Sequence, residues 1–410
     1  MNSLLSKQYK KWIRVAVFNF MLAAVMGLLL RAAFVWDFEG LEYKNMLHAH
    51  SHIAMLGWIY MALYLLIVHA FIPKKISEKH FYNRLFWLTQ ITVVGMMFSF
   101  PIQGYDTYSI LFSTAHLLLS YVFAIRVWRD TKKSTAISVK LLRLSLISLF
   151  VSTIGLLAIP IIINTDASQI TWYYIAIQFY LHFQFNGWFI LALLAVLVKY
   201  FIENKQHILR EKSYHLFTWF YLPALVFTFF HVITWAYAKA FSYVINGVGV
   251  FLQLIAVGIL VKYVLTKAKK TILRKQNNRL LILFALLSVI IKVVIQFLLI
   301  IPELARVSTE IRNFMIGYIH LINLGIISSI LFYVLYYLKI LLFRWEIKVF
   351  LLGIFATEVY LFLQGYFYWQ ALGRLPYYHL ILFLLSIPLL LGIILIYARN
   401  ISDKKILNNL

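Results

Sequence analysis

Long runs of apolar residues alternate with short polar segments along the whole chain of 410 residues. A helix needs about 20 apolar residues to cross the hydrocarbon core of a bilayer. Runs of that length predict an all-α fold, a polytopic bundle of about twelve transmembrane helices, in which residues 1–410 form one integral membrane domain. The expected spans are 13–35, 48–72, 85–103, 108–128, 141–163, 171–200, 215–238, 243–265, 280–301, 312–338, 348–370 and 376–398. We find no convincing internal repeat among them.

The composition excludes several classes of protein. Apolar residues make up 63% of the chain and charged residues only 13%, about half the charged share of a soluble domain. There is no cysteine, which excludes disulfides, thiolate-bound metals, iron–sulfur clusters and covalently attached c-type haem.

The basic residues predict how the helices are oriented. With the N-terminus in the cytoplasm and every span crossing, inner segments carry 31 of the Lys and Arg residues and outer segments carry 6. Cytoplasmic loops of membrane proteins show this excess, so both chain ends are expected inside and the protein in the inner (cytoplasmic) membrane. The net charge of +24 lies in these short loops. It indicates contact with a lipid bilayer rather than with nucleic acid.

Seven of the twelve histidines are expected in the outer half of the membrane. A single buried histidine is more often a hydrogen-bonded packing residue than a ligand. Ionisable groups at this depth are costly, however, and commonly functional, and these come from five different helices. Neutral imidazole is a ligand for haem iron and for copper. The seven are His48, His50, His52, His116, His182, His231 and His320.

The histidine-bearing helices resemble those of the haem–copper oxidase subunit I superfamily, which includes the nitric oxide reductases. In helix 2, His50 precedes Gly57 at the spacing of the family's His-Thr-Asn-x-x-x-x-Gly segment. In helix 10, Gly317, Tyr318 and His320 resemble Gly-His-Val-His, with tyrosine in place of the first histidine. The resemblance implies a haem b held by His50 and His320. His52 and His48 are alternatives to His50 as the haem ligand, and Tyr318 is a further candidate iron ligand.

The same resemblance implies a second metal site, which departs from the family pattern. His182 in helix 6 matches the first copper ligand. His231 in helix 7 follows Phe230, where the family has His-His. His116 in helix 4 is a candidate substitute ligand. One copper ligand and the proximal haem ligand are thus absent, and the binuclear centre is incomplete. The chain is also similar, more loosely, to NnrS-type haem and copper membrane proteins.

These features predict a haem-binding redox membrane protein, with copper as a further candidate cofactor. The resemblance implies electron transfer from a quinol or cytochrome donor, reduction or sensing of O2 or NO, and additional oxidase-type subunits. Whether the protein is an enzyme stays open. The alternative is a transporter or permease whose histidines handle a metal or protons. Lys292 and Glu358, expected near mid-membrane, suit a proton path. A buried ion pair or a snorkelling lysine is the slightly favoured explanation.

Overall fold

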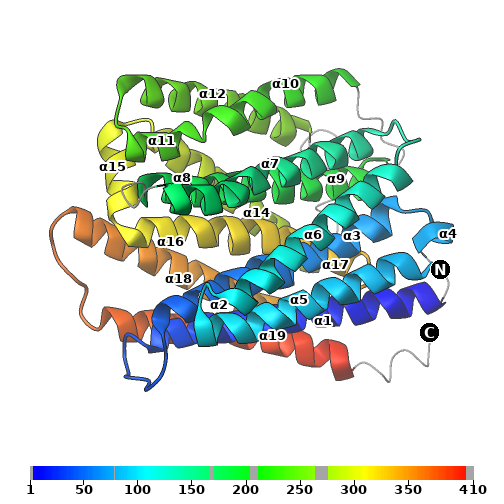
Figure 1. Ribbon diagram of the computed structural model, residues 1–410, viewed down its shortest axis with the longest axis horizontal. Coiled ribbons are helices and arrows are strands. Elements are labelled where there is room, and N and C mark those ends of the chain that lie inside the picture. The colour runs from blue at the N-terminus through cyan, green and yellow to red at the C-terminus, as the bar shows by residue number, and fades with distance from the viewer. Residues whose placement is uncertain (1–2, 78, 166–169, 204–210, 264–275, 403–410) are drawn as a thin grey trace. The chain divides into compact units, whose positions relative to one another are not determined.

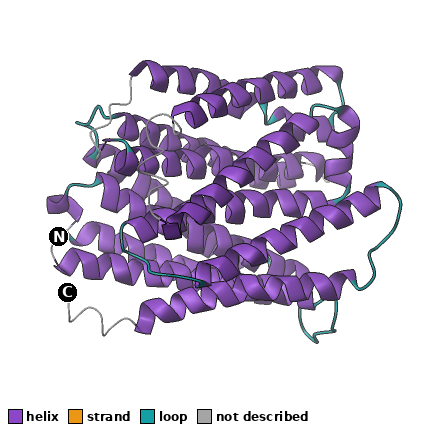
Figure 2. Cartoon of the chain, turned by 180° about the vertical axis from the view of Figure 1, so that it is seen from behind, coloured by secondary structure: helices purple, strands orange, loops and turns teal. Residues whose placement is uncertain are grey.

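The computed structural model describes residues 3–77, 79–165, 170–203, 211–263 and 276–402. Throughout these ranges the chain is built of helices joined by short loops, and no β-strand occurs in them (Figure 2). This confirms the predicted all-α fold of a polytopic helix bundle. The basic cluster expected between Lys262 and Arg279 lies mostly outside the described residues.

The chain divides into two compact units, and each is described here by itself. Unit 1 comprises residues 1–133 and 331–410, and unit 2 comprises residues 134–330. The chain therefore passes from one unit to the other twice, after residue 133 and after residue 330. That residues 1–410 act as one membrane domain stays a prediction. The helices are labelled in Figure 1.

The helices of unit 1 are α1 (Ser3–Ala32), α2 (Tyr43–His52), η1 (Ile53–Tyr60), α3 (Met61–Phe71), α4 (Lys74–Ser77), α5 (His80–Gln103), α6 (Thr107–Asp130), α18 (Glu346–Trp369) and α19 (Tyr378–Ser402). Those of unit 2 are α7 (Ile137–Thr165), α8 (Ile170–His182), η3 (Phe183–Phe189), α9 (Ile190–Phe201), α10 (Glu211–Phe227), α11 (Phe230–Ala236), α12 (Ala240–Tyr263), α14 (Gln276–Leu298), α15 (Pro302–Glu310), α16 (Arg312–His320) and η6 (Leu321–Ser328). The second boundary between the units, after residue 330, lies in α17 (Ser329–Tyr337).

Within the described ranges, eleven helices are long and apolar enough to cross a membrane. The remaining expected span, 348–370, coincides with α18, which is a continuous helix of 24 residues but falls outside these eleven. A contact between α1 and α19 concerns the number of crossings. Nε of Arg14, in the first half of α1, donates to the backbone oxygen of Asn400, near the end of α19, at 3.0 Å. This contact brings the first half of α1 and the end of α19 to the same end of unit 1. That α18 supplies a twelfth crossing stays a prediction.

α18 and α19 pack closely because two glycines lie between them. An ideal Cβ on Gly353 of α18 would lie within 3 Å of the backbone of Leu389, and one on Gly392 of α19 would meet the backbone of Phe350 in the same way. Small residues allow transmembrane helices to approach like this. An ion pair between Arg399 and Glu346, 2.6 Å from Nη1 to Oε1, joins the opposite ends of the two helices. The two helices therefore run antiparallel.

Three of the expected spans contain a π-helical segment of seven or eight residues. These are η1, η3 and η6. The residue immediately before each of them is a histidine, namely His52, His182 and His320. π-Helical turns are rare and occur frequently at functional sites. The expected span 215–238 differs in another way, because α10 ends at Phe227 and α11 begins at Phe230.

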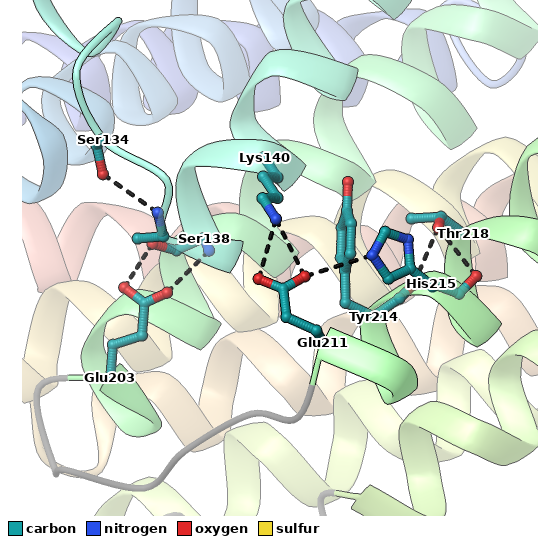
Figure 3. A network of polar contacts seen from close by, with 9 residues as sticks. Ser134, Ser138, Lys140, Glu203, Glu211, Tyr214, His215 and Thr218 are labelled. Carbon is teal, nitrogen blue, oxygen red and sulfur yellow. Dashed lines mark hydrogen bonds and ion pairs between the residues drawn. The ribbon is translucent and has the colours of Figure 1, made fainter.

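A polar network ties together the ends of three helices in unit 2 (Figure 3). Glu203 follows α9 and accepts from the backbone nitrogen and the hydroxyl of Ser138 in α7, at 2.9 and 2.7 Å. Glu211 at the start of α10 pairs with Lys140 of α7 at 2.9 Å, and His215 lies 3.5 Å away on its other side. A carboxylate at a helix N-terminus satisfies backbone N–H groups that the helix itself leaves unpaired. The network therefore stabilises this end of unit 2.

Candidate functional site

His50 is held against α1 in a defined tautomer. Its Nδ1 lies 2.8 Å from the backbone oxygen of Ala23. Because a carbonyl oxygen only accepts, Nδ1 must carry the proton, and the neutral ring then has its lone pair on Nε2. Metal-binding histidines are commonly oriented by such a bond from the other ring nitrogen.

A glycine on α1 makes room for this ring. An ideal Cβ on Gly27 would lie 2.8 Å from Cε1 of His50 and 3.2 Å from its Nδ1. Contacts this short essentially never occur at real Cβ atoms, so the position of the imidazole depends on glycine at residue 27. Ala23 and Gly27 are one turn apart, which places the hydrogen-bond acceptor and the space for the ring on one face of α1.

His52 occupies a different environment. Its Nδ1 donates to the backbone oxygen of His48 at 2.8 Å, and its Nε2 lies 3.2 Å from the hydroxyl of Tyr105. The ring also packs on Phe100, with the ring centroids 4.3 Å apart. Both nitrogens of His52 therefore have partners within the protein. His48 packs edge-on against Tyr105 at 4.6 Å.

A buried carboxyl group lies in the same unit as His50. Glu358 of α18 is 8% exposed, and its Oε2 is buried with no hydrogen-bond partner. The charge of Arg31, at the end of α1, acts on both Glu358 and His50, but no ion pair within 4.0 Å joins Arg31 to Glu358 in the described part of the chain. Lys292, the lysine considered together with Glu358 from the sequence, lies in unit 2, so a buried ion pair or a snorkelling lysine stays a prediction.

His116 of α6 is the most deeply buried of the predicted ligands. Its side chain is 2% exposed, and its Nε2 has no hydrogen-bond partner. The ring meets Tyr60 of η1 edge-on, with the centroids 4.8 Å apart. Buried polar atoms are nearly always paired, so this nitrogen is suited to a water molecule or an ion.

In unit 2, His182 donates a hydrogen bond to the backbone next to the break between α10 and α11. Its Nε2 donates to the backbone oxygen of Leu225 at 2.8 Å. The helix breaks after Phe227, and Phe229 N bonds instead to the oxygen of Val226, so the Leu225 oxygen needs another donor. The lone pair of His182 is consequently on Nδ1. His231, just beyond the break, has a buried Nδ1 with no hydrogen-bond partner.

His320 ends α16, and Tyr318 lies half-buried on the same helix. His320 belongs to unit 2 and His50 to unit 1, so their pairing across one haem stays a prediction of the sequence. The candidate ligands of the second metal site are also divided between the units, with His116 in unit 1 and His182 and His231 in unit 2. That they bind one metal together therefore stays a prediction. Nowhere in the described ranges do three His, Asp or Glu side chains gather as a metal-binding group. The copper site also stays a prediction.

The three π-helical spans share a construction that the sequence analysis missed. The glycines Gly57, Gly187 and Gly325 each follow five residues after His52, His182 and His320. Each glycine abuts a residue of the preceding span, namely Asn19, Ser148 and Ser288, with an ideal Cβ 2.6 to 3.1 Å from the nearest atom. The signal was present as His-x-x-x-x-Gly in spans 2, 6 and 10. A pattern of only two residue types in each span is too short to stand out as a repeat.

Side chains satisfy backbone oxygens that these π-helical segments leave available. Nδ2 of Asn19 donates to the oxygen of Gly57 at 3.0 Å in η1. In η3 the hydroxyl of Tyr221 donates to the oxygen of Asn186 at 2.6 Å, and in η6 the hydroxyl of Ser328 donates to that of Asn323 at 2.7 Å. In a bilayer every backbone polar group must find a partner inside the protein. The polar residues near the histidines are thus partly explained by the helix geometry.

The sequence matches no protein-family model, and no curated protein matches it significantly. The resemblance to the haem–copper oxidases accordingly rests on the helix number and on the positions of the histidines.

Proposed function

We propose that the protein is a haem-binding redox protein of the membrane, with His50 as an axial ligand of haem b. The observation that carries this proposal is the placement of His50, whose Nδ1–H donates to Ala23 O and whose ring lies against Gly27. The bond fixes the tautomer with the lone pair on Nε2 and raises the basicity of that nitrogen. His320 is the second ligand that the sequence predicts.

An aromatic cluster lies in the same unit as His50. Trp58 and Phe20 stack with their ring centroids 4.7 Å apart, and Phe332 packs on Trp58 at 5.2 Å. When bound, haem would supply one-electron chemistry and, where a coordination position is open, binding of a diatomic gas. The protein would orient the ligand, exclude water and provide a low-dielectric site. Electron transfer from a quinol or cytochrome, and reduction or sensing of O2 or NO, are the activities that the family resemblance supports.

Spectroscopy of the purified protein tests the haem proposal. We expect a Soret band and a pyridine haemochrome of the b type in the wild type, with iron and copper measured in the same sample. His50→Ala should lose the bound haem, whereas His52→Ala, the matched control two residues away, should retain it. A wild-type protein without haem, or equal haem content in both variants, would contradict the proposal.

A proton- or ion-coupled transporter is the second candidate function. It is favoured by the orphaned Oε2 of Glu358 and by Lys292, which is 4% exposed, because intramembrane ionisable groups mark ion and proton pathways. Proteoliposomes separate the two functions. Proton-dependent uptake that is lost in Glu358→Gln, in protein free of haem, would support the transporter.

A further inference from the structure

Lys292 lies in the interior of unit 2. Its side chain is only 4% exposed. It is six residues from the end of α14 at Leu298, or about 9 Å along the helix axis. Its Nζ donates to Oε1 of Gln296 at 2.7 Å. This is a polar but uncharged partner, so the contact does not neutralise an ammonium group.

A second glutamine completes the cluster from the neighbouring helix. Nε2 of Gln253, on α12, also donates to Oε1 of Gln296, at 2.7 Å. The ammonium group of Lys292 can only donate. The atom facing it must therefore be the oxygen of Gln296, and the atom of Gln253 facing that oxygen must be its nitrogen. The chemistry of lysine thus assigns both amide orientations.

The cluster is rich in hydrogen-bond donors. Lys292 has three N–H groups, and each glutamine amide has two. The two bonds to Gln296 Oε1 use one N–H of Lys292 and one of Gln253, and the described residues provide no partner for the others. The acceptor shared by both bonds is already occupied twice, which leaves only Oε1 of Gln253 as a further amide acceptor.

The described residues of unit 2 supply no negative charge to the cluster. Across the described ranges of unit 2, no carboxylate oxygen lies within 4.0 Å of Lys292 Nζ. The nearby ionisable group on which Lys292 acts electrostatically is His182, which is itself a base. Burying an ammonium group without a counter-charge is strongly unfavourable. The arrangement of one cation and several unused N–H donors is complementary to an anion.

We infer that Lys292, Gln253 and Gln296 bind a small monovalent anion, a halide or an oxyanion of nitrate size, inside unit 2. The ammonium group supplies the charge and the two amides supply directed N–H groups. The depth of Lys292 and its burial exclude a lipid headgroup as the ligand. This site is separate from the haem ligand His50, which belongs to unit 1, and the inference does not depend on the proposed function.

Chloride NMR tests the inference. The purified wild-type protein is prepared in chloride-free detergent buffer, and chloride is then added in known amounts. We expect saturable broadening of the chloride line that bromide and nitrate reverse and gluconate does not. Lys292→Gln should weaken chloride binding by about tenfold or more, since it removes a charged donor. Lys239→Gln changes an exposed lysine of the same unit and should leave the affinity unchanged.

Two further variants keep the inference testable if Lys292→Gln does not fold. Lys292→Arg keeps the charge and should keep saturable binding. Gln253→Leu keeps both charge and the Lys292 to Gln296 bond and should weaken binding by a smaller factor, about threefold to tenfold. Absence of saturable broadening in the wild type, or equal affinity in the wild type and a folded Lys292→Gln variant, would overturn the inference.

Discussion

The imidazole of His50 lies so close to Gly27 that an ideal Cβ on the glycine would be 2.8 Å from Cε1 of the ring. This contact joins α1 to α2, and the bond from Nδ1 to Ala23 O fixes the ring on the same helix face. The orientation of the predicted haem ligand is therefore decided by two residues of α1 that carry no functional group of their own in their side chains.

Gly27→Ala should displace the ring of His50 and lower haem occupancy. We expect about a tenfold loss of haem affinity, the lower end of the effect of changing a group that orients a metal ligand. Folding should be unimpaired, because alanine is favoured over glycine in a helix by about 0.5–1 kcal/mol. Haem titration followed by the Soret absorbance gives the affinity.

Gly258→Ala is the matched control, because an added Cβ there meets no atom within 4 Å. It should bind haem as the wild type does. Wild-type haem affinity in Gly27→Ala would show that the contact with His50 is unimportant.

Glu346→Gln should destabilise the pairing of α18 with α19. Glu346 is 5% exposed, and its carboxylate accepts from Arg399 at 2.6 Å and from the backbone nitrogen of Arg344 at 2.5 Å. Loss of a charge-assisted bond at a buried group costs about 2 kcal/mol. Thermal unfolding in detergent should show a lower transition temperature than in Lys348→Gln, which alters an exposed neighbour. Equal transition temperatures would be inconsistent with a stabilising ion pair.

Asn19 and Gln90 should be energetically coupled. Their side chains exchange two hydrogen bonds, of 2.9 and 3.0 Å, and Asn19 also donates to the oxygen of Gly57. Hydrogen bonds between transmembrane helices contribute about 0.5–2 kcal/mol. A double-mutant cycle with Asn19→Ala and Gln90→Ala, measured by unfolding free energies, should give a coupling energy in that range. Additive effects of the two substitutions would exclude the coupling.

Cysteine labelling tests whether α18 crosses the membrane. The chain has no cysteine, so a single introduced cysteine reports on its own position. Lys348 and Arg374 are exposed at and beyond opposite ends of α18. Lys348→Cys should react with an impermeant maleimide only from the cytoplasmic side, and Arg374→Cys only from the outside. Reaction of both from one side would mean eleven crossings.

The sequence predicted the helical fold well because its physical cause acts locally. Each span needs about 20 apolar residues whatever its neighbours are, and the expected ranges lie within or close to the observed helices. The break between Phe227 and Phe230 and the three π-helical segments were not predicted. They depend on partners in other helices, such as His182 for the Leu225 oxygen and Asn19 for the Gly57 oxygen.

The sequence by itself predicted which histidines are membrane-embedded, because the apolar runs around them indicate their depth. Only the tertiary structure distinguished among them. It placed His50 with its lone pair on Nε2 beside Gly27, gave both nitrogens of His52 partners, and left Nε2 of His116 without one. Hydrogen-bond partners come from residues distant in the chain, and hydrophobic periodicity contains no information about which of them meet.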